Sequence, residues 1–288
     1  SANKTAEAGA LTIAGTLTVT AGTLNLDTNN TALAVTGSTT NQGTITGGAA
    51  TMTFSDDVIN TGGTINAGEN DVTFAEDFTG GTLNGHGTAD PTIYFRGAAT
   101  TVGTFTHTND PIVFDGVGDQ IFVPGGSGYA AVTVNKPGGT FTVNANPLSC
   151  TSLTITDSDG CTFNTAVTAP VLTLTETTGT IAFLNNLTVS TTFSNPSGAT
   201  VNFNVNLYGT TQITNDTIFG TSGTVRLGDD DDILTFTGGF THNNAGATVL
   251  NGTLRTTNTN VAIAALALGG TSEINTNTGA GNIAISGA

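Results

Sequence analysis

A short phrase with apolar residues at its first and third positions recurs along the chain at an almost constant interval. Its nine copies are Leu11-Thr12-Ile13, Leu33-Ala34-Val35, Met52-Thr53-Phe54, Val72-Thr73-Phe74, Ile93-Tyr94-Phe95, Ile112-Val113-Phe114, Val132-Thr133-Val134, Leu153-Thr154-Ile155 and Leu172-Thr173-Leu174. Successive copies are 19 to 22 residues apart. Such alternation is typical of a half-buried β-strand, so the pattern predicts an equivalent strand in every period of about 20 residues.

A second phrase, Gly-Thr-apolar-polar, runs in step with the first and predicts a second strand in each period. Its copies begin at Gly43, Gly63, Gly81, Gly103, Gly139 and Gly179. The repeat is regular over residues 9–180 and looser over residues 181–288. In the looser part, steps of 20 or 21 residues separate Phe193, Ile213, Leu234, Leu254 and Ile274. We expect one domain that spans residues 1–288.

A fixed period of this length, built from short strands and glycine turns, is the signature of a β-solenoid in which one period forms one coil. The 288 residues would form about 14 coils of about 20 residues. Uneven coil lengths and the absence of a hexapeptide rule favour a right-handed parallel β-helix over the left-handed kind. An antiparallel β-sandwich is the alternative, because sandwiches also place strands at intervals of about 8 to 12 residues.

Composition supports an all-β chain and excludes two classes of partner. Strong helix formers are scarce, whereas Gly alone supplies 39 residues. The net charge is -16 with only 5 basic residues, which cannot neutralise the phosphates of a nucleic acid. Since no apolar run reaches about 18 residues, we expect no membrane insertion through a helix.

The small share of charged residues, 9%, together with abundant Thr and Asn, indicates an extracellular or cell-surface protein. The chain begins with Ser1 rather than Met, as expected of a processed mature chain or a fragment. Cys150 and Cys161 lack the spacing of a zinc site. A disulfide between them and two buried free thiols remain equal alternatives.

Three aspartates, Asp71, Asp90 and Asp110, each stand just before a copy of the first phrase, so we expect them to stack in one column. The favoured interpretation is that each carboxylate accepts backbone N–H groups in the turn that enters the strand. The alternative is a Ca²⁺ ion held between stacked carboxylates, whose repulsion it would relieve.

Two acid clusters allow the same pair of interpretations. "TDSDG" contains Asp157 and Asp159, whereas "GDDDD" contains Asp229, Asp230, Asp231 and Asp232. Solvated loop acids are the favoured interpretation for both. Calcium remains the alternative, chiefly for the second cluster, because adjacent carboxylates repel one another without a counter-ion. No other cofactor is indicated.

Five Asn-x-Thr sequons could carry glycans if the chain is secreted. They begin at Asn3, Asn29, Asn186, Asn215 and Asn251. A rank of threonines in one register would match the flat face of an ice-binding solenoid; its members are Thr44, Thr64, Thr82, Thr104 and Thr140. Asn66 and Asn84 interrupt the adjoining rank, and outward Thr is also simply a good strand residue.

The sequence indicates no catalytic residue. His86, His107 and His242 have no Ser or Cys partner at a recognisable spacing. A glycosidase would need two carboxylates about 5 to 10 Å apart, and β-helical pectin lyases and polygalacturonases also hold acidic sugars with Lys or Arg. With so few bases, a polysaccharide-active enzyme is the weakest of the functional alternatives.

The opening "GTLTVTAGTLNL" and the turns "GGTIN" and "GGTLN" resemble the β-helical shafts of filamentous-haemagglutinin-like adhesins and autotransporter passengers. The resemblance extends over most of the chain. It implies a secreted, surface-displayed and mostly non-enzymatic protein, including an adhesin shaft that binds cell-surface glycans.

Both ends of the chain are apolar and carry no amphipathic helix or charged segment that would cap a solenoid. The side chains expected at the two faces are Leu11, Ile13, Leu17, Val19, Val261, Ile263, Leu266, Leu268, Ile283 and Ile285. An uncapped coil predicts a partner at each end, which is either the rest of a longer shaft, if the chain is a fragment, or another copy of the chain. Identical copies joined through unlike ends would form an open filament. The sequence thus favours a self-assembling structural protein.

Overall fold

The computed structural model describes residues 3–106, 109–126, 128–175, 178–195, 203–279 and 281–287. These residues form short strands joined by turns, with no helix among them. The chain is a parallel β-solenoid with about 13 turns of about 21 residues, which confirms the predicted parallel β-helix. Strands pair with the strand one turn away, and every such pair is parallel among the described residues. The antiparallel sandwich is therefore wrong.

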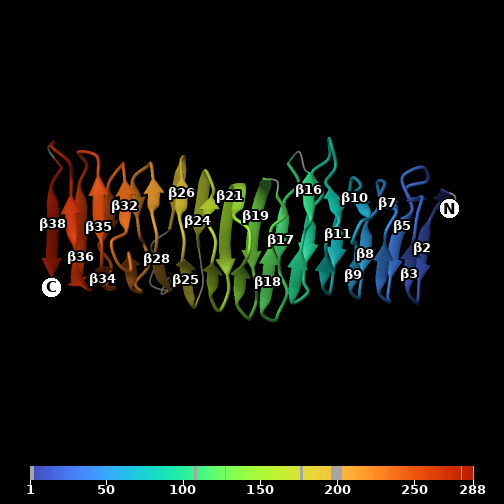
Figure 1. Cartoon of the computed structure of the whole chain (residues 1–288), viewed down its shortest axis with the longest axis horizontal. Helices are drawn as coiled ribbons and strands as arrows, with labels where there is room; N and C mark the ends of the chain where they lie inside the picture. The colour runs from blue at the N-terminus through green and yellow to red at the C-terminus, as the bar shows by residue number, and fades with distance from the viewer. Residues whose placement is uncertain are drawn as a thin grey trace. The chain divides into compact units, whose positions relative to one another are not determined.

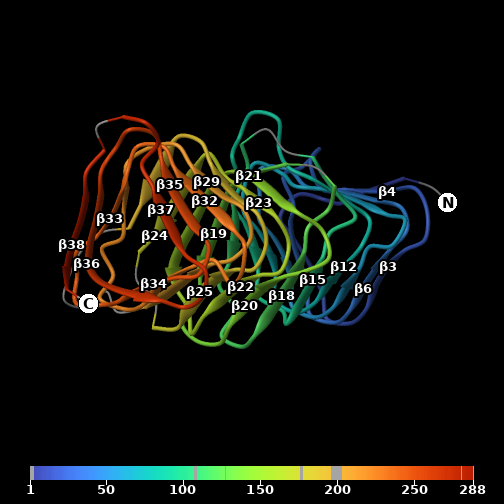
Figure 2. The ribbon, with the colours of Figure 1, turned by 60° about the vertical axis from the view of Figure 1, so that its left-hand side comes forward.

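The chain divides into two compact units, Ser1–Gly139 and Thr140–Ala288. In the N-terminal unit, each complete turn contributes one strand to each of three parallel stacks (Figures 1 and 2). The first stack contains β2 (Ala10–Ile13), β5 (Ala32–Val35), β8 (Met52–Phe54), β11 (Val72–Phe74), β14 (Ile93–Phe95), β17 (Ile112–Phe114) and β19 (Tyr129–Asn135). The second contains β3 (Leu17–Val19), β6 (Thr39–Asn41), β9 (Val58–Ile59), β12 (Phe78–Thr79), β15 (Ala99–Thr101) and β18 (Gln120–Val123). The third contains β1 (Lys4–Thr5), β4 (Thr23–Asn25), β7 (Thr44–Thr46), β10 (Thr64–Asn66), β13 (Thr82–Asn84) and β16 (Thr104–Thr106).

The C-terminal unit is built from the same kind of parallel stacks. One contains β20 (Phe141–Val143), β22 (Cys161–Phe163), β25 (Thr180–Phe183), β28 (Asn204–Leu207), β31 (Val225–Leu227), β34 (Thr248–Leu250) and part of β36 (Val261–Leu268). A second contains part of β21 (Leu148–Asp157), then β23 (Val167–Thr168), β26 (Leu187–Val189), β29 (Thr211–Ile213), β32 (Ile233–Phe236), β35 (Thr253–Thr256) and β37 (Glu273–Asn275). Further strands are β24 (Val171–Leu174) and β27 (Thr192–Ser194), which stack on β21, and β30 (Thr217–Ile218), β33 (Phe240–His242) and β38 (Ile283–Gly287), which stack with β36.

The predicted register of the first phrase is confirmed in the N-terminal unit. Phe54, Phe74, Phe95 and Phe114 occupy one inward column, and neighbouring rings lie 5.2 to 5.6 Å apart between centroids. All four rings are fully buried. Stacking like on like at the strand spacing of about 4.8 Å lets each ring cover the next in an offset arrangement.

The structure adds a third strand to each turn that the two phrases did not reveal. The inward column of the second stack mixes apolar and polar side chains, since Thr39 pairs with Val58, and Phe78 pairs with Thr100. Thr39 and Thr100 are nevertheless at most 2% exposed. A search for large apolar residues at a fixed period misses such a strand because polar residues interrupt its inward column.

In the looser part of the repeat, Leu234, Leu254 and Ile274 share one column as expected, but Phe193 and Ile213 do not belong to it. Phe193 pairs with Leu172 in β24, whereas Ile213 lies in β29 and pairs with Phe236. Leu234 pairs with Thr211 instead of Ile213. Since each turn carries several strands, a constant step of about 20 residues cannot distinguish strands in different stacks.

The turns require glycine where the backbones of successive coils nearly touch. Gly81 has a φ of +70°, and a Cβ at this position would collide with the carbonyl oxygen and the side chain of Asn60. The Asn60 side chain is fully buried and donates to Thr82 O at 3.0 Å. A side chain at residue 81 would therefore push the two coils apart.

We predict that Gly81→Ala lowers the free energy of unfolding of the N-terminal unit by about 2 to 3 kcal/mol, through both the clash and the left-handed backbone. Gly87→Ala is the matched control, because a Cβ there meets nothing within 4 Å. The control should change stability by less than about 1 kcal/mol. Urea unfolding of both variants measures the difference, and equal stabilities would contradict the close-approach argument.

Candidate functional site

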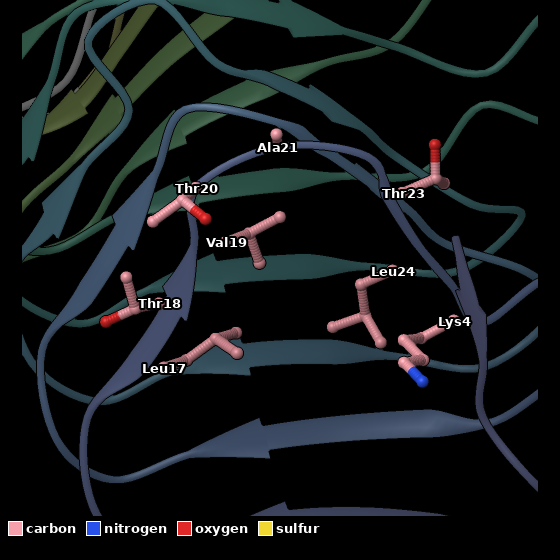
Figure 3. Close-up of a pocket in the computed structure, with 8 residues that line it drawn as sticks. All are labelled: Lys4, Leu17, Thr18, Val19, Thr20, Ala21, Thr23 and Leu24. Carbon is pink, nitrogen blue, oxygen red and sulfur yellow. The ribbon is translucent and has the colours of Figure 1, made fainter. Parts of the chain in front are cut away.

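The outermost coil of the N-terminal unit leaves its interior open. Leu17, Val19 and Leu24 point into a hollow of about 230 Å³, and the side chain of Lys4 lies beside Leu24 (Figure 3). Leu17 and Leu24 remain partly exposed. One or two turns further in, the same columns contain Thr39, Val58 and Ile45, which are at most 1% exposed. The hollow therefore exposes core columns that have no further coil on one side.

Lys4 occupies a core position of the third stack. It pairs in register with Leu24, and the next residues of that column are Ile45 and Ile65, which are completely buried. Lys4 itself is exposed in this outer strand, so its charge is solvated. The periodicity of the sequence did not reveal this residue, because Lys4 precedes the first copy of either phrase.

The outermost coil of the C-terminal unit also exposes its core positions. Ile283 and Ile285 in β38 pair with Val261 and Ile263 in β36, and they are 48% and 45% exposed. Leu268, which pairs with the buried Leu250, is 66% exposed. These side chains have a coil on one side only.

Not every side chain expected at the two faces is open. Val261 and Ile263 are at most 1% exposed because Ile283 and Ile285 cover them. Val19 is 9% exposed. The expectation that these three lie open at an end is therefore corrected. Leu11, Ile13, Leu17 and Leu266 are partly exposed, as the interior of an outer coil should be.

The three aspartates expected in one column do not share a register position. Val72, Ile93 and Ile112 pair across β11, β14 and β17, and the aspartates precede them by one, three and two residues. Equal steps along the chain concealed this offset, since the intervening turns differ in length. The expectation of a single Asp71, Asp90 and Asp110 column is wrong.

Two of these carboxylates instead form hydrogen bonds between neighbouring coils. Asp71 Oδ1 accepts the backbone N–H of Thr92 at 3.0 Å. Asp110 is completely buried, and its Oδ1 accepts the backbone N–H of His86 at 2.9 Å. Asp90 is exposed. Acceptance of backbone N–H groups at turns is the role that we favoured for these residues.

The two acid clusters lie mainly at the surface. Asp159 and Asp229 to Asp231 are exposed, and Asp157 and Asp232 are partly exposed. Asp232 Oδ2 accepts the backbone N–H of Asp229, and the hydrogen bond between the two side chains raises the pKa of Asp229. Among the described residues, no group of three or more His, Cys, Asp or Glu side chains could hold a metal ion. Calcium binding stays a prediction.

Both cysteines are buried free thiols. Burial raises the pKa of Cys150 to about 12, so its thiol stays protonated at neutral pH. The Sγ atom of Cys161 lies 3.3 Å from Ser158 Oγ.

Four of the five sequon asparagines contact the adjacent coil. Asn29 Nδ2 donates to Ala6 O at 2.8 Å, and Asn215 Nδ2 donates to Thr191 O. Asn3 and Asn186 each accept a backbone N–H through Oδ1. Asn251 is partly buried in a turn. Glycosylation of these residues also stays a prediction.

A buried cation inside the N-terminal unit escaped the sequence analysis. Lys136 is 0% exposed, and its Nζ donates to Gly116 O at 2.7 Å, to Gly118 O and to Gln120 Oε1 at 3.0 Å. Gln120 Nε2 in turn donates to two backbone carbonyls of the neighbouring coil. The ammonium group thus holds together a loop whose carbonyls would otherwise lack donors.

We predict that Lys136→Met lowers the free energy of unfolding by about 3 kcal/mol, because it leaves these acceptors buried without their donor. Arg255→Met is the control, since Arg255 is exposed on β35; its effect should stay within about 0.5 kcal/mol. Chemical denaturation compares the two. An unchanged stability of Lys136→Met would show that the loop does not depend on the cation.

The histidines differ in their surroundings. His86 Nδ1 accepts the backbone N–H of Ala89 at 2.9 Å, and His107 lies outside the described residues. His242 is completely buried, with Nδ1 2.9 Å from Thr248 Oγ1 and Nε2 3.2 Å from Thr221 O. Burial lowers the pKa of His242 by disfavouring the imidazolium form.

Since the pKa of His242 is lower in the folded than in the unfolded state, the unfolded chain binds this proton first as the pH falls. The stabilisation from a neutral His242 is complete above about pH 6.5 and decreases below it. We predict that the loss of stability between pH 7.5 and 5.5 is smaller in His242→Gln than in the unsubstituted chain. Urea unfolding at both pH values tests this, and parallel losses would assign the pH dependence to other groups.

A surface groove of about 560 Å³ lies over the loops that follow β14 and β17. Its lining includes Glu76, Arg96, Asp115, Val117 and Asp119. Arg96 forms a bidentate ion pair with Asp115, with Nη2 2.9 Å from Oδ2, and its guanidinium carbon lies 5.4 Å from the ring centroid of Tyr94. The groove thus presents a paired cation and several acids at the surface.

The chain matches no protein-family model, no curated protein and no solved structure. The β-solenoid architecture therefore rests on the structure itself, and the likeness to adhesin and autotransporter shafts stays one of repeat style. The described residues contain no helix long and apolar enough to cross a membrane.

Proposed function

We propose that this chain is a non-enzymatic structural protein whose copies join end to end through their open coils, forming an extracellular filament or surface appendage. One observation carries the proposal. Ile283, Ile285 and Leu268 belong to core columns yet are 45 to 66% exposed. Leu17 and Leu24 likewise line a hollow at the outer coil of the N-terminal unit.

An open coil favours association for two physical reasons. Burying the exposed apolar side chains would contribute about 25 cal/mol for every Å² removed from water. The outer strands also offer backbone groups that a further parallel strand could satisfy. A contact between unlike ends does not close on itself, so each added copy offers a new open end.

Several features support a structural rather than a catalytic role and an extracellular location. Asp71 and Asp110 accept backbone hydrogen bonds from neighbouring coils. The two acid clusters lie at solvent-exposed turns. The chain carries few charges and much Gly, Thr and Asn, as the surface of a secreted shaft would.

A cell-surface adhesin shaft is the second candidate, and the groove beside Arg96 favours it. Its ion pair and exposed Glu76 offer donors and acceptors suited to the hydroxyl groups of a glycan. Glycan-array binding by protein that does not polymerise would support this candidate over the filament.

We predict that the purified chain forms filaments whose mass increases with protein concentration, seen by negative-stain microscopy and sedimentation. Ile285→Lys should abolish assembly, because it places a charge in the open core column. Ile218→Lys is the matched control, since Ile218 is 50% exposed on β30 and lies away from the outer coil. Monomers alone at high concentration, or equal inhibition by both variants, would contradict the proposal.

A further inference from the structure

The joint between two copies has three geometrically distinct arrangements, and the side chains favour one of them. This inference rests on the proposed end-to-end assembly. The outer coil of the N-terminal unit offers β1, β2 and β3 in chain order, and that of the C-terminal unit offers residues 266–268 of β36, then β37 and β38. Parallel stacking that preserves chain order allows β2 to lie over β38, β37 or residues 266–268.

The apolar pattern matches best when β2 lies over β38. Leu11 and Ile13 are two positions apart, as are Ile283 and Ile285. The same arrangement puts β3 over residues 266–268, where Leu17 and Val19 meet Leu266 and Leu268. Each apolar pair then covers another apolar pair, as Val72 and Phe74 cover Met52 and Phe54 in the first stack.

The other two arrangements break this match. With β2 over β37, two apolar side chains meet the single core residue Ile274. With β2 over residues 266–268, β3 lies over β37, and Leu17 and Val19 meet the single core residue Ile274. Either arrangement leaves apolar positions uncovered.

We propose that the joint has a single register, in which β1 stacks on β37, β2 on β38 and β3 on residues 266–268 of the partner copy. Leu11 and Ile13 cover Ile283 and Ile285 of the partner copy.

Cysteine pairs distinguish the three arrangements, because stacked outward residues lie within the Cα separation that a disulfide accepts, about 4.4 to 6.8 Å. Thr12 is the outward residue of β2 in all three variants. Thr12→Cys combined with Ala284→Cys reports the proposed register, whereas Asn275→Cys and Ala267→Cys as partners report the alternatives. The native thiols stay in place because both are buried, and the unsubstituted chain is the control.

After mild oxidation, we expect a ladder of covalent oligomers on a denaturing gel only from the Ala284 pair. A stronger ladder from either alternative pair overturns the register but leaves end-to-end assembly intact. Filaments without any ladder also overturn the register. Monomers by microscopy and no ladder in any variant overturn the assembly itself, so the two failures are distinguishable.

Discussion

Each strand lies over its counterpart one turn away, about 4.8 Å distant, and this spacing governs the rest of the structure. Inward side chains must meet residues of compatible shape in the turns on either side. The ladder from Phe54 to Phe114 satisfies the requirement with parallel rings, and Gly81 satisfies it where backbones nearly touch. The repeat in the sequence therefore results from the contacts between coils, because no single coil can bury its own interior.

Several polar groups in the interior find their partners through the same stacking, whereas the buried hydroxyl groups of Thr39 and Thr211 have no hydrogen-bond partner. Asn41 Nδ2 donates to Asn60 Oδ1 at 2.7 Å, and Lys136 and His242 bond to neighbouring turns. Buried polar groups of this kind fix the register, because a shift by one residue would leave them unpaired.

The sequence predicted those columns whose inward residues are large and apolar, such as Val72 and Phe74, because they recur in every turn. It did not predict the strands around Thr39 and Thr100, whose polar inward residues interrupt the periodicity. Equal spacing along the chain also assigned Ile213 and Asp90 to the wrong columns, because turns of different length can give the same step in the sequence. The open apolar faces were predictable from composition. The contacts of Lys136 and the position of Lys4 at the start of an inward column became visible only with the register of the strands.

A stack of this kind contains no internal signal that ends it. Neighbouring turns bury the interior of each turn between them, so only the two outer coils leave apolar core positions exposed to water. Here the exposed core residues are Leu268 and Ile283, and a hollow lies beside Leu17. An outer coil is chemically a surface for one more coil, which a second copy of the chain would supply in the assembly proposed above. The proposal therefore rests on the outer faces rather than on any cluster of acids or histidines.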